Sequence, residues 1–185
     1  MEIKILIEHL ELIGKLSDEL KIFISNRVRK TSYRKNDLIY RQGENLQKMY
    51  FIVKGMVVGE HYVEDRNHLC WFLKEQDFIA DLESFVYHQP AKCTAIAAEK
   101  CDLLWLSYQD IHTLKNTFPE FNYIYGRLLE NYHIYDNQRM QLLMILHCQG
   151  RYQKFKEYFK WADQRLKRSH IASFLEMAPG TLSKL

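Results

Sequence analysis

The longest regular pattern in the chain is a stripe of apolar and aromatic residues in its second half. Between Thr117 and His147 these residues recur at alternating steps of four and three, which is the heptad spacing of a coiled-coil seam. Thr117 and Glu120 form a capping box, and Pro119 falls in the first turn, where its missing N–H costs nothing. The pattern therefore predicts one helix over 117–147, roughly 45 Å long. The stripe comprises Phe121, Tyr125, Leu128, Tyr132, Tyr135, Arg139, Leu142 and Leu146.

Two interpretations fit such a helix. It covers the sheet of its own chain, or it pairs with the same helix of a second copy and joins a sensing domain to a reading domain. Strict heptad spacing is narrower than the apolar face of an ordinary surface helix. We therefore expect the stripe to be the interface of a homodimer, with Arg139, its one charged member, as a register or switch element.

The residues before this helix change from helical to strand-like periodicity. Apolar residues over 3–10 share one helical face, and Ser17 is placed to cap a second short helix over 18–26. From residue 30 onward, short runs rich in β-branched and aromatic residues alternate with turn sequences. Many short strands at this spacing predict a sandwich or jelly roll rather than alternating β–α units. The predicted strands are 38–40, 49–53, 56–63, 69–73, 93–97 and 103–106.

Two turn glycines belong to a motif that suggests a family. Gly43 and Gly55 fall between predicted strands, where a positive φ is cheap only for Gly. Together with the strand between them they resemble the Gly-Glu, Tyr-Phe-Ile and Gly-x-Val pattern of the cyclic-nucleotide-binding β-roll. The similarity continues through the Asp-Phe-Ile at 77–79 and through the long helix. The chain as a whole resembles the transcription factors of the Crp/Fnr superfamily.

This resemblance implies an α+β fold in three parts. Residues 1–116 would form a double-stranded β-helix (a jelly roll of the cyclic-nucleotide-binding type) with flanking helices. Residues 117–147 would form the long dimerisation helix, and residues 148–185 a winged-helix-like helix-turn-helix domain. The implied partners are double-stranded DNA, a second copy of the chain and RNA polymerase. The expected function is that of a one-component transcription regulator that binds a palindromic site.

The residues that would bind a cyclic nucleotide are replaced in this chain. In nucleotide-binding members a Gly-Glu pair follows the Asp-Phe-Phe motif, and an Arg binds the phosphate. Read without gaps, Gly becomes Ala80, Glu becomes Asp81, and Arg becomes Ala91. The adjacent Lys92 keeps a positive charge but lacks the planar two-donor geometry of Arg. We therefore expect no useful binding of cyclic AMP, and no other cofactor is predicted. The degenerate pocket comprises Ala80, Asp81, Leu82, Glu83, Ala91, Lys92 and Cys93.

The segment 170–185 is similar to the helix-turn-helix of the same family. Ser169 is placed to cap a helix through Met177, and Pro179 takes the first position of a second helix. Glu176 occupies the turn position that is commonly Gly, where a left-handed backbone costs a non-Gly residue ~1 kcal/mol. We expect the recognition helix to continue beyond Leu185, so that the domain is truncated. By this resemblance the residues that contact DNA are Arg168, Ser169, His170, Pro179, Gly180, Thr181, Ser183 and Lys184.

The charge distribution agrees with a DNA-binding C-terminal segment. The net charge is +3, but residues 146–185 hold eight of the 26 Lys and Arg and only three of the 23 Asp and Glu. Such a basic segment favours a polyanionic partner. The four cysteines have neither zinc-ligand nor iron–sulfur spacing, so we expect reduced thiols in a cytoplasmic protein without membrane contact. No His-x-His pair or phosphate loop occurs, which argues against an enzyme.

A second function is compatible with the same features. A degenerate β-roll dimer would serve as a protein-interaction module without sequence-specific DNA binding, and its basic tail would contact another protein or a membrane surface. Operator binding is distinguishable from this alternative because it weakens steeply with salt and still favours one sequence.

Overall fold

A β-roll of two antiparallel sheets forms the centre of the molecule. The computed structural model, which describes residues 2–185, orders one sheet β1-β8-β3-β6 and the other β2-β7-β4-β5. Large side chains such as Tyr50 and Ile52 fill the space between the sheets and are 3% and 0% exposed. The strands are β1 Arg29–Tyr33, β2 Leu38–Tyr40, β3 Lys48–Lys54, β4 Val57–Val63, β5 Arg66–Leu73, β6 Phe78–Ile79, β7 Thr94–Ala97 and β8 Cys101–Ser107. The predicted jelly roll is confirmed.

The sequence pattern found six of these strands and missed two. It missed β1, an edge strand of the sequence Arg-Lys-Thr-Ser-Tyr that pairs only with β8 and has no apolar alternation. It also missed β6, which has two residues. The two turn glycines have positive φ angles, +88° at Gly43 and +99° at Gly55, as predicted.

Two helices precede the β-roll where they were predicted. They are α1 Glu2–Ile13 and α2 Asp18–Arg27, and the Ser17 side chain accepts the Leu20 N–H at 3.3 Å as the N-cap of α2. Leu20 and Ile24 are fully buried in a cluster that also contains the first turns of the long helix α5. A third short helix, α3 Leu82–Tyr87, lies within the β-roll segment.

The long helix is shorter than predicted, and its capping box is not formed. Thr117 ends a separate helix, α4 Tyr108–Thr117, and α5 runs from Pro119 to Leu143. Phe118 interrupts the two helices because a residue before proline is disfavoured in the α region; its φ and ψ are −119° and 100°. Glu120 binds the Ser17 hydroxyl (2.6 Å) instead of a helix cap. With 25 residues, α5 is about 37 Å long.

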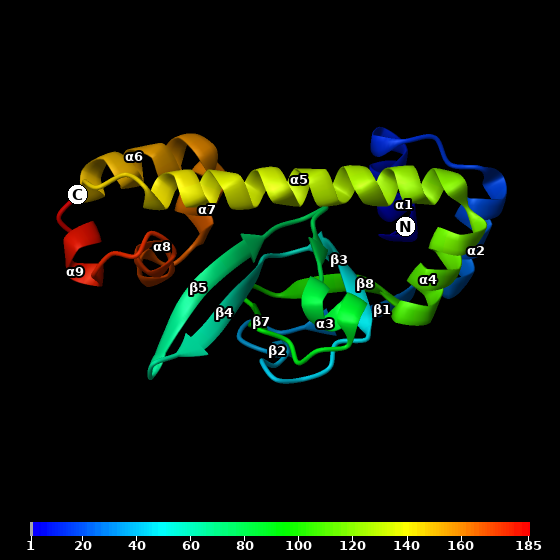
Figure 1. Cartoon of the computed structure of the whole chain (residues 1–185), viewed down its shortest axis with the longest axis horizontal. Coiled ribbons are helices and arrows are strands. Elements are labelled where there is room, and N and C mark those ends of the chain that lie inside the picture. Colours follow the sequence, from blue (N-terminus) through cyan, green and yellow to red (C-terminus); the bar gives the residue numbers. More distant parts are fainter. Residues whose placement is uncertain (1) are drawn as a thin grey trace.

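Four short helices follow α5 and gather at its carboxyl end (Figure 1). They are α6 Cys148–Tyr158, α7 Lys160–Arg165, α8 Arg168–Phe174 and α9 Pro179–Leu182. Helix α5 runs along the β-roll, and the β4–β5 hairpin extends toward α8 (Figure 1). Phe72 of β5 packs edge to face against Phe174 of α8, with ring centroids 4.7 Å apart. The hydrophobic core therefore continues from the β-roll into the C-terminal helices.

The turn between α8 and α9 corrects one prediction and confirms another. Ser169 does not cap α8, because the N-cap is Lys167, and the helix ends at Phe174 rather than Met177. Glu176 has the left-handed backbone predicted for it, with φ +51°. The N–H of Met177 bonds to Ala172 O and that of Glu176 to Ser173 O, which together form a Schellman motif. Pro179 begins α9 as predicted.

None of the helices within residues 2–185 combines the length and the hydropathy that a membrane crossing requires.

Candidate functional site

The residues predicted for the degenerate effector pocket come together at the start of α3. Asp81 is the N-cap of α3, and its carboxylate accepts the N–H of Ser84 (3.1 Å) and that of Lys92 (2.7 Å). The Lys92 ammonium lies 3.7 Å from the Glu83 carboxylate. The polar groups at these positions therefore satisfy one another, which leaves little positive charge for a phosphate.

Backbone bonds close the other side of this pocket. Ala91 is 2% exposed, and its carbonyl and N–H bond to the Gly43 N–H and the Glu44 carbonyl, each at 2.8 Å. Cys93 is also buried. A methyl group and a closed turn thus occupy the position of the expected phosphate-binding Arg.

Large aromatic side chains fill the interior of the β-roll. The indole of Trp71, on β5, lies on the Cα of Gly59, on β4, so closely that a Cβ at Gly59 would overlap the ring. Tyr40 is 4% exposed, and burial raises the pKa of its phenol well above the usual value. The hydroxyl of Tyr40 is buried without a hydrogen-bond partner within the described chain. Sequence reasoning missed Trp71, although a glycine inside a predicted strand is a known sign of close approach.

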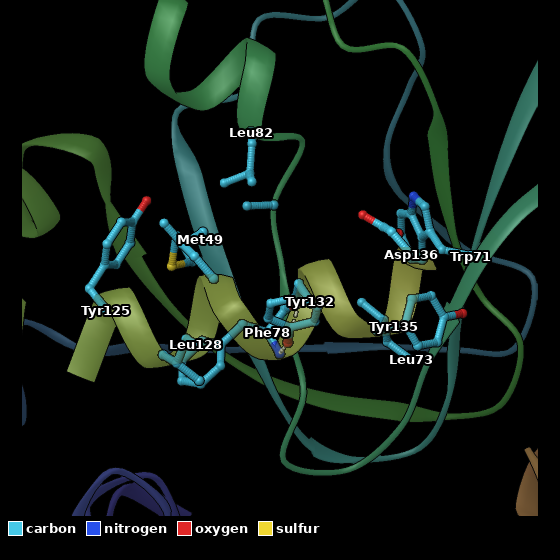
Figure 2. A pocket seen from close by; sticks show the side chains of 12 residues that line it. Met49, Trp71, Leu73, Phe78, Leu82, Tyr125, Leu128, Tyr132, Tyr135 and Asp136 are labelled. Carbon is cyan, nitrogen blue, oxygen red and sulfur yellow. Dashed lines mark hydrogen bonds between the residues drawn. The ribbon is translucent and has the colours of Figure 1, made fainter. Parts of the chain in front are cut away.

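An apolar groove remains between the β-roll and α5 (Figure 2). Its volume is about 160 Å³. The aromatic rings of Tyr132 and Tyr135 face it from α5, and their hydroxyls bond to the backbone of Phe78 and Phe72 at distances of 2.5 to 3.3 Å. The remaining lining residues are Met49, Trp71, Leu73, Phe78, Ala80, Leu82, Tyr125, Leu128, Leu129 and Asp136.

The heptad stripe predicted as a dimer interface faces this chain's own domains. Phe121, Tyr125 and Leu142 are buried against the β-roll, the N-terminal helices and the C-terminal helices. Tyr132 and Tyr135 bind β-strand backbone, and Leu146 lies beyond the end of α5 and is 86% exposed. Most of the stripe therefore packs within this chain, whereas Leu146 is exposed.

Arg139 connects α5 to the turn between α8 and α9. Its guanidinium lies 3.8 Å from the Glu176 carboxylate and 5.0 Å from the ring centroid of Phe174. The residue predicted as a register element between two copies therefore contacts the C-terminal helices of its own chain.

The predicted DNA-contacting residues separate into two groups. Pro179, Gly180, Ser183 and Lys184 are exposed around α9, and Thr181 is half-buried there. By contrast, His170 is turned inward, 3.6 Å from Glu60 on β4. Burial lowers the pKa of His170, and its Nδ1 has no partner within residues 2–185.

Arg168 and Ser169 are the remaining predicted DNA-contacting residues, and both are exposed at the start of α8. The Arg168 guanidinium donates to the Tyr152 hydroxyl and to the Leu182 carbonyl (3.0 Å), so it fixes the end of α9. Ser169 lines a cavity of about 610 Å³ between the β4–β5 hairpin and α8. Within residues 2–185 no three His, Cys, Asp or Glu side chains are placed to hold a metal ion.

One family model matches the central part of the chain. Residues 30–118 match the family described as the cyclic nucleotide-binding domain. The match spans the β-roll, which is therefore similar to cyclic nucleotide-binding domains. The search of curated proteins found no match to the chain.

Solved structures share this fold over most of the chain. The c-di-GMP responsive global regulator CLP of Xanthomonas campestris is 14% identical, with TM-score 0.75 over 91% of this chain and 89% of its own. FixK2 from Bradyrhizobium japonicum is 17% identical, with TM-score 0.69 over 85% and 81%. The catabolite activator protein of Thermus thermophilus is 18% identical, with TM-score 0.60 over 94% and 83%. At these identities the likeness is one of fold.

One arginine joins the β-roll to the C-terminal helices. The Arg165 guanidinium binds both carboxylate oxygens of Glu75 (2.8 and 3.0 Å) and both of Glu99 (2.7 and 3.0 Å). Partial burial opposes ionisation of Glu75, but hydrogen bonds from Arg165 and from backbone N–H groups lower the pKa of Glu75 to about 2. This contact could not be predicted from local pattern, because Arg165 lies 66 residues from Glu99 and 90 residues from Glu75 along the chain.

Proposed function

We propose that this chain is a dimeric transcription regulator that binds palindromic DNA through the α8–α9 pair. The observation that carries this proposal is the exposed amino end of α9. The Schellman motif at Glu176 turns the chain out of α8, and Pro179 starts α9 with its first residues in solvent. Helices in this arrangement present their N-terminal residues to base edges in the major groove. The shared fold with Crp/Fnr-type regulators supports the same interpretation.

The dimer we propose uses the outward face of α5 rather than the stripe predicted from the sequence. Exposed or half-buried residues repeat along it at steps of four and three, as a parallel coiled coil requires. Gly126 has open space around it, so two helices can approach closely there. The proposed interface comprises Asn122, Gly126, Leu129, His133, Asp136 and Met140. Leu129 and Asp136 also line the groove between α5 and the β-roll, so the groove opens beside this interface.

In this proposal a change in the β-roll domain reaches DNA through two contacts. Arg165 ties the domain to α7, and Ser173 of α8 accepts the Leu69 N–H of β5 at 2.9 Å. A shift of β5 relative to α5 would therefore move α8 and change the spacing of the two reading helices. Such coupling requires an effector that favours one arrangement over the other.

Random-site selection on duplex DNA tests the proposal. With the whole protein, including any residues that follow Leu185 in its gene, we expect enrichment of a palindrome whose half-site centres are about 34 Å apart. Lys184→Glu should abolish enrichment, whereas Lys4→Glu, on α1, should not. Salt-sensitive binding without any enriched sequence, in buffer and in cell extract alike, would contradict the proposal and favour an interaction module.

A further inference from the structure

The groove between α5 and the β-roll has a form suited to a small aromatic molecule. Side chains from β3, β5, β6 and α5 line it, and Tyr125 and Asp136 mark opposite ends (Figure 2). Its volume of about 160 Å³ is close to the ~150 Å³ of an apolar cavity that holds a benzene ring. Pockets of this kind are mostly apolar and fix their ligand with a few polar groups.

Asp136 is the polar group available for that purpose. The hydroxyls of Tyr132 and Tyr135 are already bonded to strand backbone, so these side chains offer ring faces rather than free donors. Asp136 lies at the end of the groove opposite Tyr125 (Figure 2), and partial burial raises the pKa of its carboxyl group. Arg139 and His133, on the same helix, lie close enough to favour the ionised carboxylate of Asp136 and so limit this rise in its pKa, although Arg139 also contacts Glu176 and Phe174.

The charges around the groove favour a cation. Asp81 and Glu83 are the chain neighbours of Leu82, which lines the groove, and Lys92 is paired with Glu83 through its ammonium and with Asp81 through its backbone N–H. A phosphate in the groove would meet the Asp136 carboxylate, whereas an ammonium group would pair with it. Aromatic faces also attract cations, most strongly that of Trp. Trp71 is fixed in place by its contact with Gly59.

We propose that this groove binds an apolar or aromatic molecule that carries a cationic nitrogen. The ring lies among Trp71, Phe78 and Tyr132, and the nitrogen pairs with Asp136. The inference rests on the proposed sensor role of the domain, for which it names the class of effector. It is the electrostatic opposite of a cyclic nucleotide.

Titration calorimetry with three matched probes tests the inference. We expect 2-phenylethylamine to bind more tightly than 2-phenylethanol, and phenylacetate and cyclic AMP not to bind. Asp136→Asn removes the charge with little change in shape and should weaken amine binding about tenfold, because a hydrogen bond to a charged group contributes about 1.5 kcal/mol or more. Glu130→Gln is the matched control, since Glu130 is on α5 but pairs with Arg127 outside the groove. It should leave the affinity unchanged.

Three results would overturn the inference. They are equal binding of the amine and the alcohol, tighter binding of phenylacetate or cyclic AMP, and an Asp136→Asn protein that keeps the wild-type affinity for the amine. Sedimentation equilibrium on the same samples adds a fourth: loss of amine binding when the dimer forms would show that a second copy fills the groove. None of these measurements uses DNA, so failure here is distinguishable from failure of the proposed regulator function.

Discussion

The guanidinium of Arg165 lies between two carboxylates that come from different turns of the β-roll. Glu75 also accepts the Gly55 N–H at 2.9 Å, so one side chain connects α7 to the β3–β4, β5–β6 and β7–β8 connections. An Arg bound bidentately to a carboxylate has a fixed geometry that a Lys cannot reproduce. The contact is therefore well placed to hold the C-terminal helices in one orientation.

Glu75→Gln tests the strength of this contact. The pKa of Glu75 is about 2 in the folded protein against 4.5 for a free Glu side chain, so its ionised form stabilises the fold above about pH 4.5. That contribution is lost as the pH falls from 4.5 toward 2. Because the side chain is 37% exposed, we discount the shift for solvent screening and expect a loss of about 1–2 kcal/mol at pH 7.

Urea unfolding at pH 7 and at pH 3 measures this effect. The wild type should lose part of its advantage over Glu75→Gln at the lower pH. Glu8→Gln, which removes an exposed pair with Lys4 on α1, should change the unfolding free energy by a few tenths of a kcal/mol. A Glu75→Gln protein as stable as the wild type at pH 7 would contradict the argument.

Helix α5 illustrates what periodicity reveals about an element and what it leaves open. The heptad stripe correctly indicated a long helix with one buried face. It contained no information on whether that face meets another copy or the same chain, because Tyr and Leu pack equally well against either. The start of the helix was misjudged since the restriction that Pro119 places on Phe118 outweighed the Thr117 capping box.

The effector pocket likewise combines features that the sequence predicts with features that only the structure reveals. The replacements at Ala80, Asp81 and Ala91 could be identified from the sequence, and the structure places these residues together. Asp81 accepts the Ser84 N–H as the N-cap of α3. The hydrogen bond from the Lys92 N–H to Asp81 could not be predicted, because it depends on how the chain folds back eleven residues later. Trp71 went unnoticed as a pocket residue for the same reason.

Strand β4 depends on the absence of a side chain at one position. Gly59→Ala would place a methyl group within the Trp71 indole, and we expect it to destabilise the fold by about 2–3 kcal/mol through overpacking. In Gly59→Ala/Trp71→Ala the clash is gone, so the double variant should be more stable than the sum of the two single changes predicts. Strictly additive unfolding free energies would be inconsistent with this contact.

Gly126→Ala is a contrasting control on α5. Nothing lies within 4 Å of the added methyl group, and Ala favours a helix over Gly, so the unfolding free energy of the monomer should rise by about 1 kcal/mol. Urea denaturation of the four variants separates the two outcomes.

At the scale of the whole molecule, the position of α5 decides how two copies can meet. Much of its inward face packs on this chain, and the dimer we propose therefore uses the outward face. Leu129→Glu places a charge on the proposed interface and should dissociate the dimer without unfolding the monomer. Ile134→Glu changes a residue that is 55% exposed but lies off the proposed interface, and it should leave the dimer intact.

Sedimentation velocity combined with circular dichroism measures both properties. Dissociation by Leu129→Glu should also reduce operator affinity, since one half-site then has no second reading helix. If the two variants had the same effect on the dimer, the proposed face would be wrong.

The contact between Trp71 and Gly59 also constrains the order in which the sequence can change. A tryptophan at 71 is accommodated only while position 59 has no side chain. Conversely, a larger residue fits at position 59 only after Trp71 has been replaced by a smaller one. Any series of substitutions that changes position 59 before position 71 would therefore pass through a protein destabilised by this clash.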